Sequence, residues 1–237
     1  MKKALFTLFL AGAAALLGAS HAIACGTQDG YSYAGLASPS RAFGIGAAVT
    51  PVGSFNIVSG HVAGWVGVGG PGQGTNGTDE WLQVGFSGFP WATGSDLYYE
   101  VTLPNGQPAY HQIAADLPAG QTARFAVLEM HARPNWWRVW LNGSPASPPI
   151  YLAGSHDRWA PIATAESWDG GSGGACNGFL YRFDRVSIAR APGGGWHPLS
   201  GAEEISSTST RVRRGNFASF MAAEGDDALR VLATASG

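Results

Sequence analysis

The chain has 237 residues, of which 35 are glycine and 14 are proline, and 11% are aromatic. This composition favours many short strands joined by turns and leaves little room for long helices. Charged residues make up only 13% of the chain, which excludes a dominant basic surface for nucleic acid and an acidic disordered tail. A chain of this length buries a sizeable core, and two-sheet β architectures commonly use it as one domain.

The first 24 residues have the pattern of an export signal. Lys2 and Lys3 precede an apolar run over residues 4–17, and Ala22-Ile23-Ala24 is a small-x-small cleavage site. The apolar run is shorter than a membrane span, and no later segment competes with it. We therefore predict a signal peptide over residues 1–24, a secreted or periplasmic protein and no membrane span.

The chain contains two cysteines, Cys25 and Cys176. Two cysteines in an exported chain favour one disulfide, which here pins the mature N-terminus to the glycine-rich loop 170–178. The alternative is a lipid anchor on Cys25 of a cell-surface lipoprotein. The two predictions exclude each other because one sulfur cannot carry both bonds.

After the signal, short apolar segments alternate with clusters of Gly, Pro, Asn and Ser. The predicted strands cover residues 31–36, 43–49, 55–68, 80–86, 97–103, 108–113, 124–131, 135–141, 150–152, 161–168, 179–189 and 216–222. Short strands separated by turns predict an all-β fold, an antiparallel two-sheet sandwich. We assign residues 25–192 to the sandwich domain and residues 193–237 to a C-terminal extension that supplies the last predicted strand.

Residues 80–86 read Glu-Trp-Leu-Gln-Val-Gly-Phe and alternate strictly. Leu82, Val84 and Phe86 face one way and are predicted core residues. Trp81 and Gln83 face the other way, which places an indole beside a primary amide on the opposite face. This pairing is unusual for a surface that is merely solvated.

Residues 162–168 form a matching segment, Ile-Ala-Thr-Ala-Glu-Ser-Trp. Thr164, Glu166 and Trp168 share one face, and small residues occupy the other. Trp65, in the predicted strand 55–68, also lies on the face away from the core. We hypothesise that Gln83 and Glu166 meet across one sheet face and form a hydrolytic pair.

Five short motifs occur in one order along the chain. They are Tyr33-Ala34-Gly35, Trp65-Val66-Gly67-Val68, Leu82-Gln83-Val84-Gly85, Tyr99-Glu100 and Ala165-Glu166. This set resembles the glutamic peptidases (eqolisins), which are secreted acid proteases with a concanavalin-like sandwich of two sheets. The resemblance covers roughly residues 31–188. Two positions depart from the family pattern: Gly69 replaces an aspartate, and Ser167 separates the glutamate from the following tryptophan.

The resemblance implies that Gln83 and Glu166 are the catalytic residues and that a polypeptide is the substrate. Trp65 and Trp81 are then expected to shape the substrate groove. Glu100, Tyr98 and Trp168 are further candidates for substrate binding.

The chemistry of the two catalytic candidates fits amide hydrolysis. One glutamate can take a proton from water and then give it to the leaving nitrogen, while a glutamine amide donates to the oxyanion. A free glutamate titrates near ~4.3, so such a site is expected to work in acid. This chemistry requires no cofactor, no metal and no covalent nucleophile.

Other readings of the same residues remain open. Gln83 taken alone is explained by a hydrogen bond to a neighbouring strand, and Glu166 by pairing with an arginine such as Arg158. The histidines His61, His111, His131 and His156 lack metal-ligand spacing and are interpreted as structural or surface residues. The rival function is a non-catalytic lectin-like module that binds a glycan, or a module that binds a peptide, because the same fold hosts both classes.

Overall fold

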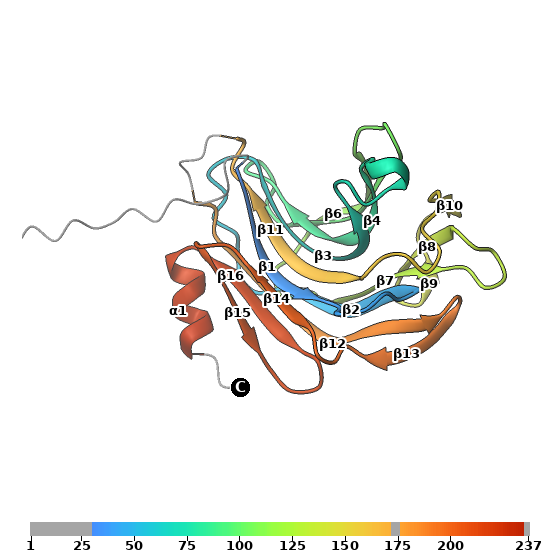
Figure 1. Cartoon of the computed structure of the whole chain (residues 1–237). Helices are drawn as coiled ribbons and strands as arrows, with labels where there is room; N and C mark the ends of the chain where they lie inside the picture. The colour runs from blue at the N-terminus through green and yellow to red at the C-terminus, as the bar shows by residue number, and fades with distance from the viewer. Residues whose placement is uncertain (1–29, 172–175, 235–237) are drawn as a thin grey trace, which may run out of the picture.

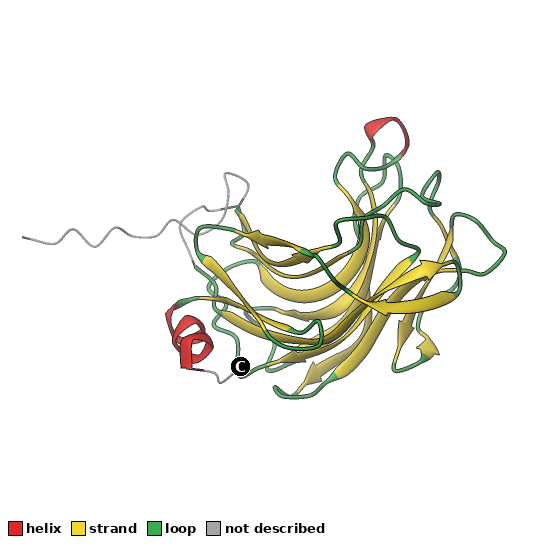
Figure 2. Ribbon diagram, turned by 60° about the horizontal axis from the view of Figure 1, so that its bottom comes forward, coloured by secondary structure: helices red, strands yellow, loops and turns green. Residues whose placement is uncertain are grey.

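The computed structural model describes residues 30–171 and 176–234. Within these ranges the protein is a sandwich of two antiparallel sheets, with a 3-10 turn at Thr75–Gly77 and one short helix, α1 (Asp226–Thr234). Figures 1 and 2 show the two layers. The all-β prediction is thus confirmed. The signal peptide and Cys25 lie outside the described residues, so export and the disulfide or lipid anchor stay predictions.

The first sheet carries the motifs singled out in the sequence. In spatial order it consists of β14 (Glu203–Ser206), β1 (Tyr31–Ala37), β11 (Ile162–Trp168), β3 (His61–Gly70), β4 (Glu80–Gly88), β5 (Ser95–Thr102) and β6 (Ala109–Leu117). Its central strands are strongly bent, and the second sheet follows the same bend beneath them (Figure 1).

The second sheet forms the other side of the core. Its strands are β10 (Ile150–Tyr151), β8 (Trp136–Leu141), β7 (Ala123–Glu129), β2 (Gly44–Pro51), β12 (Phe179–Ala191), β16 (Phe220–Glu224) and β15 (Thr210–Arg214), with β13 (Gly194–Pro198) paired to β12 and β9 (Ser144–Pro145) paired to β8. No helix among residues 30–171 and 176–234 is long and apolar enough to cross a membrane.

The core lies between the sheets and follows the predicted alternation. Leu82, Val84 and Phe86 are completely buried, and the Phe86 ring packs edge-on against Phe125 of β7, with the ring centres 5.3 Å apart. Because successive side chains of a strand point to opposite faces, Gln83 must lie on the face of the first sheet turned away from the second sheet. We call this the outer face.

Two regions differ from the strands expected from the sequence. The predicted strand 55–68 begins only at His61, because Gly60 adopts a positive φ of 71° that ends an extended run. Residues 194–214 contain β13, β14 and β15, which the sequence analysis did not predict. Their glycine-, serine- and threonine-rich composition carries little apolar alternation for the pattern to detect.

Candidate functional site

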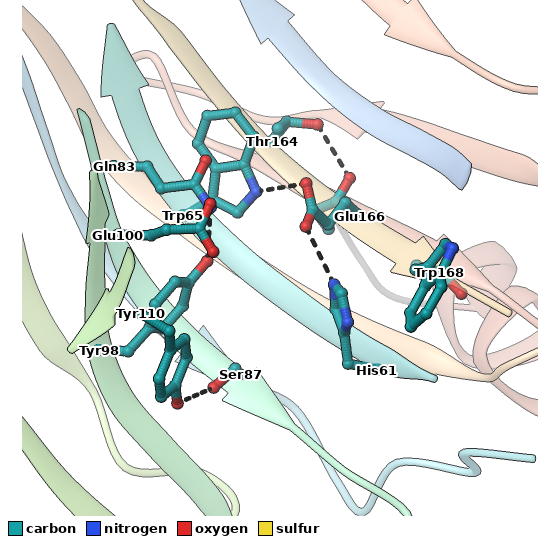
Figure 3. Close-up of polar contacts among 12 residues, drawn as sticks. His61, Trp65, Gln83, Ser87, Tyr98, Glu100, Tyr110, Thr164, Glu166 and Trp168 are labelled. Atoms are coloured by element: carbon teal, nitrogen blue, oxygen red, sulfur yellow. Dashed lines mark hydrogen bonds and ion pairs between the residues drawn. The ribbon is translucent and has the colours of Figure 1, made fainter. Parts of the chain in front are cut away.

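Gln83 and Glu166 both lie on the outer face of the first sheet. Gln83 stands on β4 and Glu166 on β11, and β3 runs between these two strands. The chain neighbour of Glu166, Ala165, is fully buried in the core, so the glutamate points to the outer face. Figure 3 shows both side chains on the same side of the ribbon, with the Trp65 indole between them.

The strand register sets the separation of the two residues. Gln83 is paired with Gly67 of β3, whereas Glu166 is paired with Ala63 of the same strand. These two partners are four residues apart along β3, and β4 and β11 are two strand spacings apart. In a flat sheet this offset corresponds to a Cα separation of about 16 Å between Gln83 and Glu166. Among the described residues, no hydrogen bond joins Gln83 directly to Glu166.

The carboxylate of Glu166 is held by two nitrogen donors from β3. Trp65 donates its Nε1–H to Oε2 at 3.0 Å, and His61 Nε2 lies 3.3 Å from Oε1. Only 8% of Glu166 is exposed, because the neighbouring rings cover it. The sequence analysis offered Arg158 as a partner, but that guanidinium donates to the carbonyl of Gly74 instead.

The amide of Gln83 makes a cross-strand hydrogen bond. Its Nε2 donates to the hydroxyl of Tyr98 on β5 at 3.0 Å, as the simpler reading of Gln83 expects. Tyr98 stacks on Tyr110 of β6 with ring centres 5.0 Å apart, and the Tyr110 hydroxyl is 2.8 Å from that of Ser87. A primary amide has two N–H groups, so this bond fixes the orientation of Gln83 and uses only one of them.

A second carboxyl group, that of Glu100, faces the same region. Glu100 is paired with Gln83 across β4 and β5 and accepts a hydrogen bond of 2.9 Å from Trp81 Nε1. Burial raises the pKa of Glu100, and the negative charge of Glu166 raises it further, while the Trp81 bond and His61 act in the opposite direction. Glu100 therefore keeps its proton to a higher pH than a free glutamate does.

Aromatic rings from β1 and β11 border the site beyond Glu166. Tyr31 stacks on Tyr33 with ring centres 6.1 Å apart, and Trp168 stacks on Tyr31 at the same distance. Burial raises the pKa of both tyrosines, and the charge of Glu166 adds to the shift. Trp168 borders the site through its contact with Tyr31, and both tyrosine hydroxyls remain neutral.

The structure explains why position 69 carries no side chain. Gly69 has a positive φ of 79°, and a Cβ atom there would lie 2.2 Å from the carbonyl oxygen of Glu80. A carboxylate at this position, as in the family pattern, is incompatible with the path of this chain. In this chain the groups that contact the Glu166 carboxylate are the ring nitrogens of Trp65 and His61.

His61 is a site residue to which the sequence assigns no catalytic or binding role. It is interpreted as structural or surface because the histidines lack metal-ligand spacing, although it lies four residues before Trp65 in an alternating strand and so shares its face. Recognising its contact with Glu166 required the pairing of β3 with β11, which the sequence alone does not supply.

Comparison with known proteins agrees with the architecture. Two structures of scytalido-glutamic peptidase, both with transition-state analogues, superpose with TM-scores of 0.53 and 0.54. They are 15% and 16% identical in sequence, and the matches cover 81% and 83% of this chain and 97% and 98% of theirs. An alginate lyase from Pseudomonas aeruginosa matches less well, with a TM-score of 0.45, 10% identity, and coverage of 69% of this chain and 67% of its own.

At these identities the matches define a class of fold, the concanavalin-like sandwich, and nothing narrower. No family model matches the chain, and no curated protein matches its sequence.

Proposed function

We propose that this protein is an exported, acid-acting endopeptidase of the glutamic type, with a polypeptide as its substrate. The observation that carries the proposal is the placement of Gln83 and Glu166 on one outer face, on the two strands that flank β3. The similarity in fold to scytalido-glutamic peptidase supports it. Among the described residues, the Glu166 carboxylate contacts the ring nitrogens of Trp65 and His61, and the Gln83 amide contacts a tyrosine hydroxyl.

In the proposed reaction, Glu166 is the general base and then the general acid. Its carboxylate takes a proton from a water molecule as the water oxygen bonds to the substrate carbonyl carbon. The same proton then passes to the amide nitrogen as the carbon–nitrogen bond breaks. Trp65 and His61 each occupy one carboxylate oxygen, and each oxygen retains a further lone pair for the water.

Gln83 stabilises the charge that develops on the substrate oxygen. Its second N–H donates to the oxyanion, while the bond to Tyr98 holds the amide in place. A donor fixed before the reaction is worth most, because no reorganisation is needed in the transition state. Removing one such donor typically costs about 10²–10³ in kcat.

The site charge favours operation in acid. While Glu100 is protonated, it places no negative charge beside the developing oxyanion. As the pH rises through the raised pKa of Glu100, a second negative charge appears beside the developing oxyanion and opposes it. Activity is therefore expected to fall toward neutral pH.

The direct test is cleavage of a denatured protein at acid pH. The purified wild-type protein is expected to cleave it, whereas Glu166→Gln abolishes cleavage and Gln83→Ala lowers kcat by about 10²–10³. Glu204→Gln and Gln121→Ala, at exposed positions, are matched controls that keep full activity. Circular dichroism checks that all variants are folded. Undiminished cleavage by either site variant would show that the catalytic assignment is wrong.

The rival function gives a different result in the same experiment. A binding module shows no turnover at any pH but binds a glycan or a peptide, and it loses affinity when Trp65 or Trp81 is replaced by alanine.

A further inference from the structure

His61 approaches Glu166 from the start of β3. It is paired in register with Trp168 of β11, which places its imidazole on the outer face beside the carboxylate. The Nε2 atom lies 3.3 Å from Glu166 Oε1, and the His61 side chain is 25% exposed. Since Trp65 occupies the other oxygen, the two β3 side chains together define the plane of the carboxylate.

The imidazole is itself held by rings on three sides. Trp168 lies 5.7 Å from it and Phe89 lies 6.2 Å from it, measured between ring centres, and Tyr31 lies at 6.5 Å. These contacts come from β11, from the loop after β4 and from β1 respectively. A side chain with so many ring neighbours has few alternative rotamers, so the contact with Glu166 is prearranged rather than incidental.

We propose that His61 is a positioning residue for Glu166, which holds the carboxylate in the orientation that the proposed reaction needs. This role rests on the peptidase function proposed above. The imidazolium donates an N–H and carries a positive charge, so it both orients the carboxylate and stabilises its ionised form. The neutral ring with a proton on Nε2 still orients the carboxylate but adds no charge.

Other titratable groups of the described residues interact with this contact. Glu166 itself lies on β11 and Glu100 on β5, and the hydroxyls of Tyr31 and Tyr33 interact with Glu166 from β1. Both tyrosines stay neutral because their pKa values are raised. Glu100 is the other carboxyl group of the region, so its contribution is removed in the test.

The test compares kcat and KM of the wild type with those of His61→Gln, and repeats the comparison in a Glu100→Gln background. Glutamine keeps a donor but removes the imidazole. The wild type is expected to exceed His61→Gln in kcat by up to about tenfold, within the value of one hydrogen bond to a charged group.

Two further variants separate positioning from folding. His61→Ala, which has no donor, should lose activity in kcat rather than in KM, and His61→Gln should restore much of that loss. His111→Gln is the matched control, since His111 lies on the same sheet but stacks on Tyr99; it should leave kcat and KM unchanged. In ¹⁵N-edited NMR spectra, the His61 Nε2 resonance should move when Glu166 becomes glutamine.

The possible results are distinguishable. A His61→Ala protein with the wild-type kcat, or an Nε2 resonance that does not move on Glu166→Gln, overturns the role of His61. Cleavage by the wild type would still leave the peptidase proposal standing. A wild-type protein without turnover overturns both proposals.

Discussion

Glu100 is the residue through which the structure links the site to pH. It is paired with Gln83 on the neighbouring strand, and burial and the charge of Glu166 raise its pKa. A raised pKa means that the neutral form persists into mildly acid solution and is lost as the pH rises. The falling limb of the activity profile should therefore report the ionisation of Glu100.

The variant Glu100→Gln tests this link. Glutamine cannot ionise and preserves an acceptor for Trp81, so the falling limb of kcat/KM should move to higher pH while the maximal rate stays within a few-fold of the wild type. Asp184→Asn, on the second sheet, is a control that leaves the profile in place. A Glu100→Gln profile that coincides with that of the wild type would show that Glu100 does not determine the pH dependence of kcat/KM.

At the residue scale, the sequence predicts which side chains are candidates for the site, but not which of them contact each other. Alternation in residues 80–86 and 162–168 placed Gln83 and Glu166 on the face away from the core, as the structure has them. Alternation predicts the sheet face on which a side chain lies, but not the register between paired strands. It therefore cannot show that Trp65 separates the two side chains. The same limit hid the contact between His61 and Glu166, which depends on pairing between segments about a hundred residues apart.

At the scale of elements, glycines let the strands of the site approach closely. Gly85 on β4 is paired with Trp65 on β3, and a Cβ atom at position 85 would lie 2.2 Å from the carbonyl oxygen of Gly64 and 2.7 Å from the Cα atom of Trp65. Both obstacles are backbone, so they cannot rotate away. The strand β4, which carries Gln83, therefore packs closely against β3, whose side chains orient Glu166.

We expect Gly85→Ala to lower stability and activity together. The β3–β4 pair must separate to admit the methyl group, at a cost of about 1–3 kcal/mol, and the Trp65 indole must move away from Glu166. Gly215→Ala is the matched control, because the nearest atom to a Cβ there is 3.6 Å away. Urea unfolding curves and kcat/KM give the two readouts. A Gly85→Ala protein with wild-type stability would contradict the close approach described here.

The order of strands was less predictable than their existence. Most strand segments were visible as short apolar alternations bounded by Gly, Pro or Asn. The pairing of β11 between β1 and β3 joins segments far apart in the sequence, and local propensity contains no information about such neighbours. The strands β13 to β15 were missed because their serine, threonine and glycine content resembles loop composition.

At the scale of the whole molecule, buried carboxyl groups favour stability in acid. Glu224 on β16 is 1% exposed and accepts hydrogen bonds from Ser32 of β1 at 2.8 Å and from Ser209 at 2.6 Å, so it joins the two sheets. Burial raises its pKa, the serine bonds act in the opposite direction, and Asp169 adds to the increase. Burial also raises the pKa of Glu80.

The sign of the resulting pH dependence follows from linkage. A carboxyl group with a pKa higher in the folded than in the unfolded state binds its proton more tightly when folded. It therefore adds stability at low pH, and this contribution is lost as the pH rises through the folded-state pKa. The midpoint of thermal unfolding should be higher at pH 4 than at pH 7, and Glu224→Gln should flatten that difference. Each 1 kcal/mol corresponds to about 2–4 °C in a chain of this size.

Differential scanning calorimetry over this pH range gives the measurement. Glu203→Gln, at an exposed position, is the control and should reproduce the wild-type slope. A stability that rises steadily from pH 4 to pH 7 would contradict the role of the buried carboxyl groups.

The central claim is that Gln83 and Glu166 act on one substrate carbonyl across the Trp65 indole. The most direct test is a crystal structure of the protein with a peptide-based transition-state analogue. The tetrahedral centre is expected to lie over Trp65, with one oxygen within hydrogen-bond distance of the Gln83 amide and another within reach of the Glu166 carboxylate. An analogue that contacts only one of these side chains, or that binds away from the outer face, would contradict it.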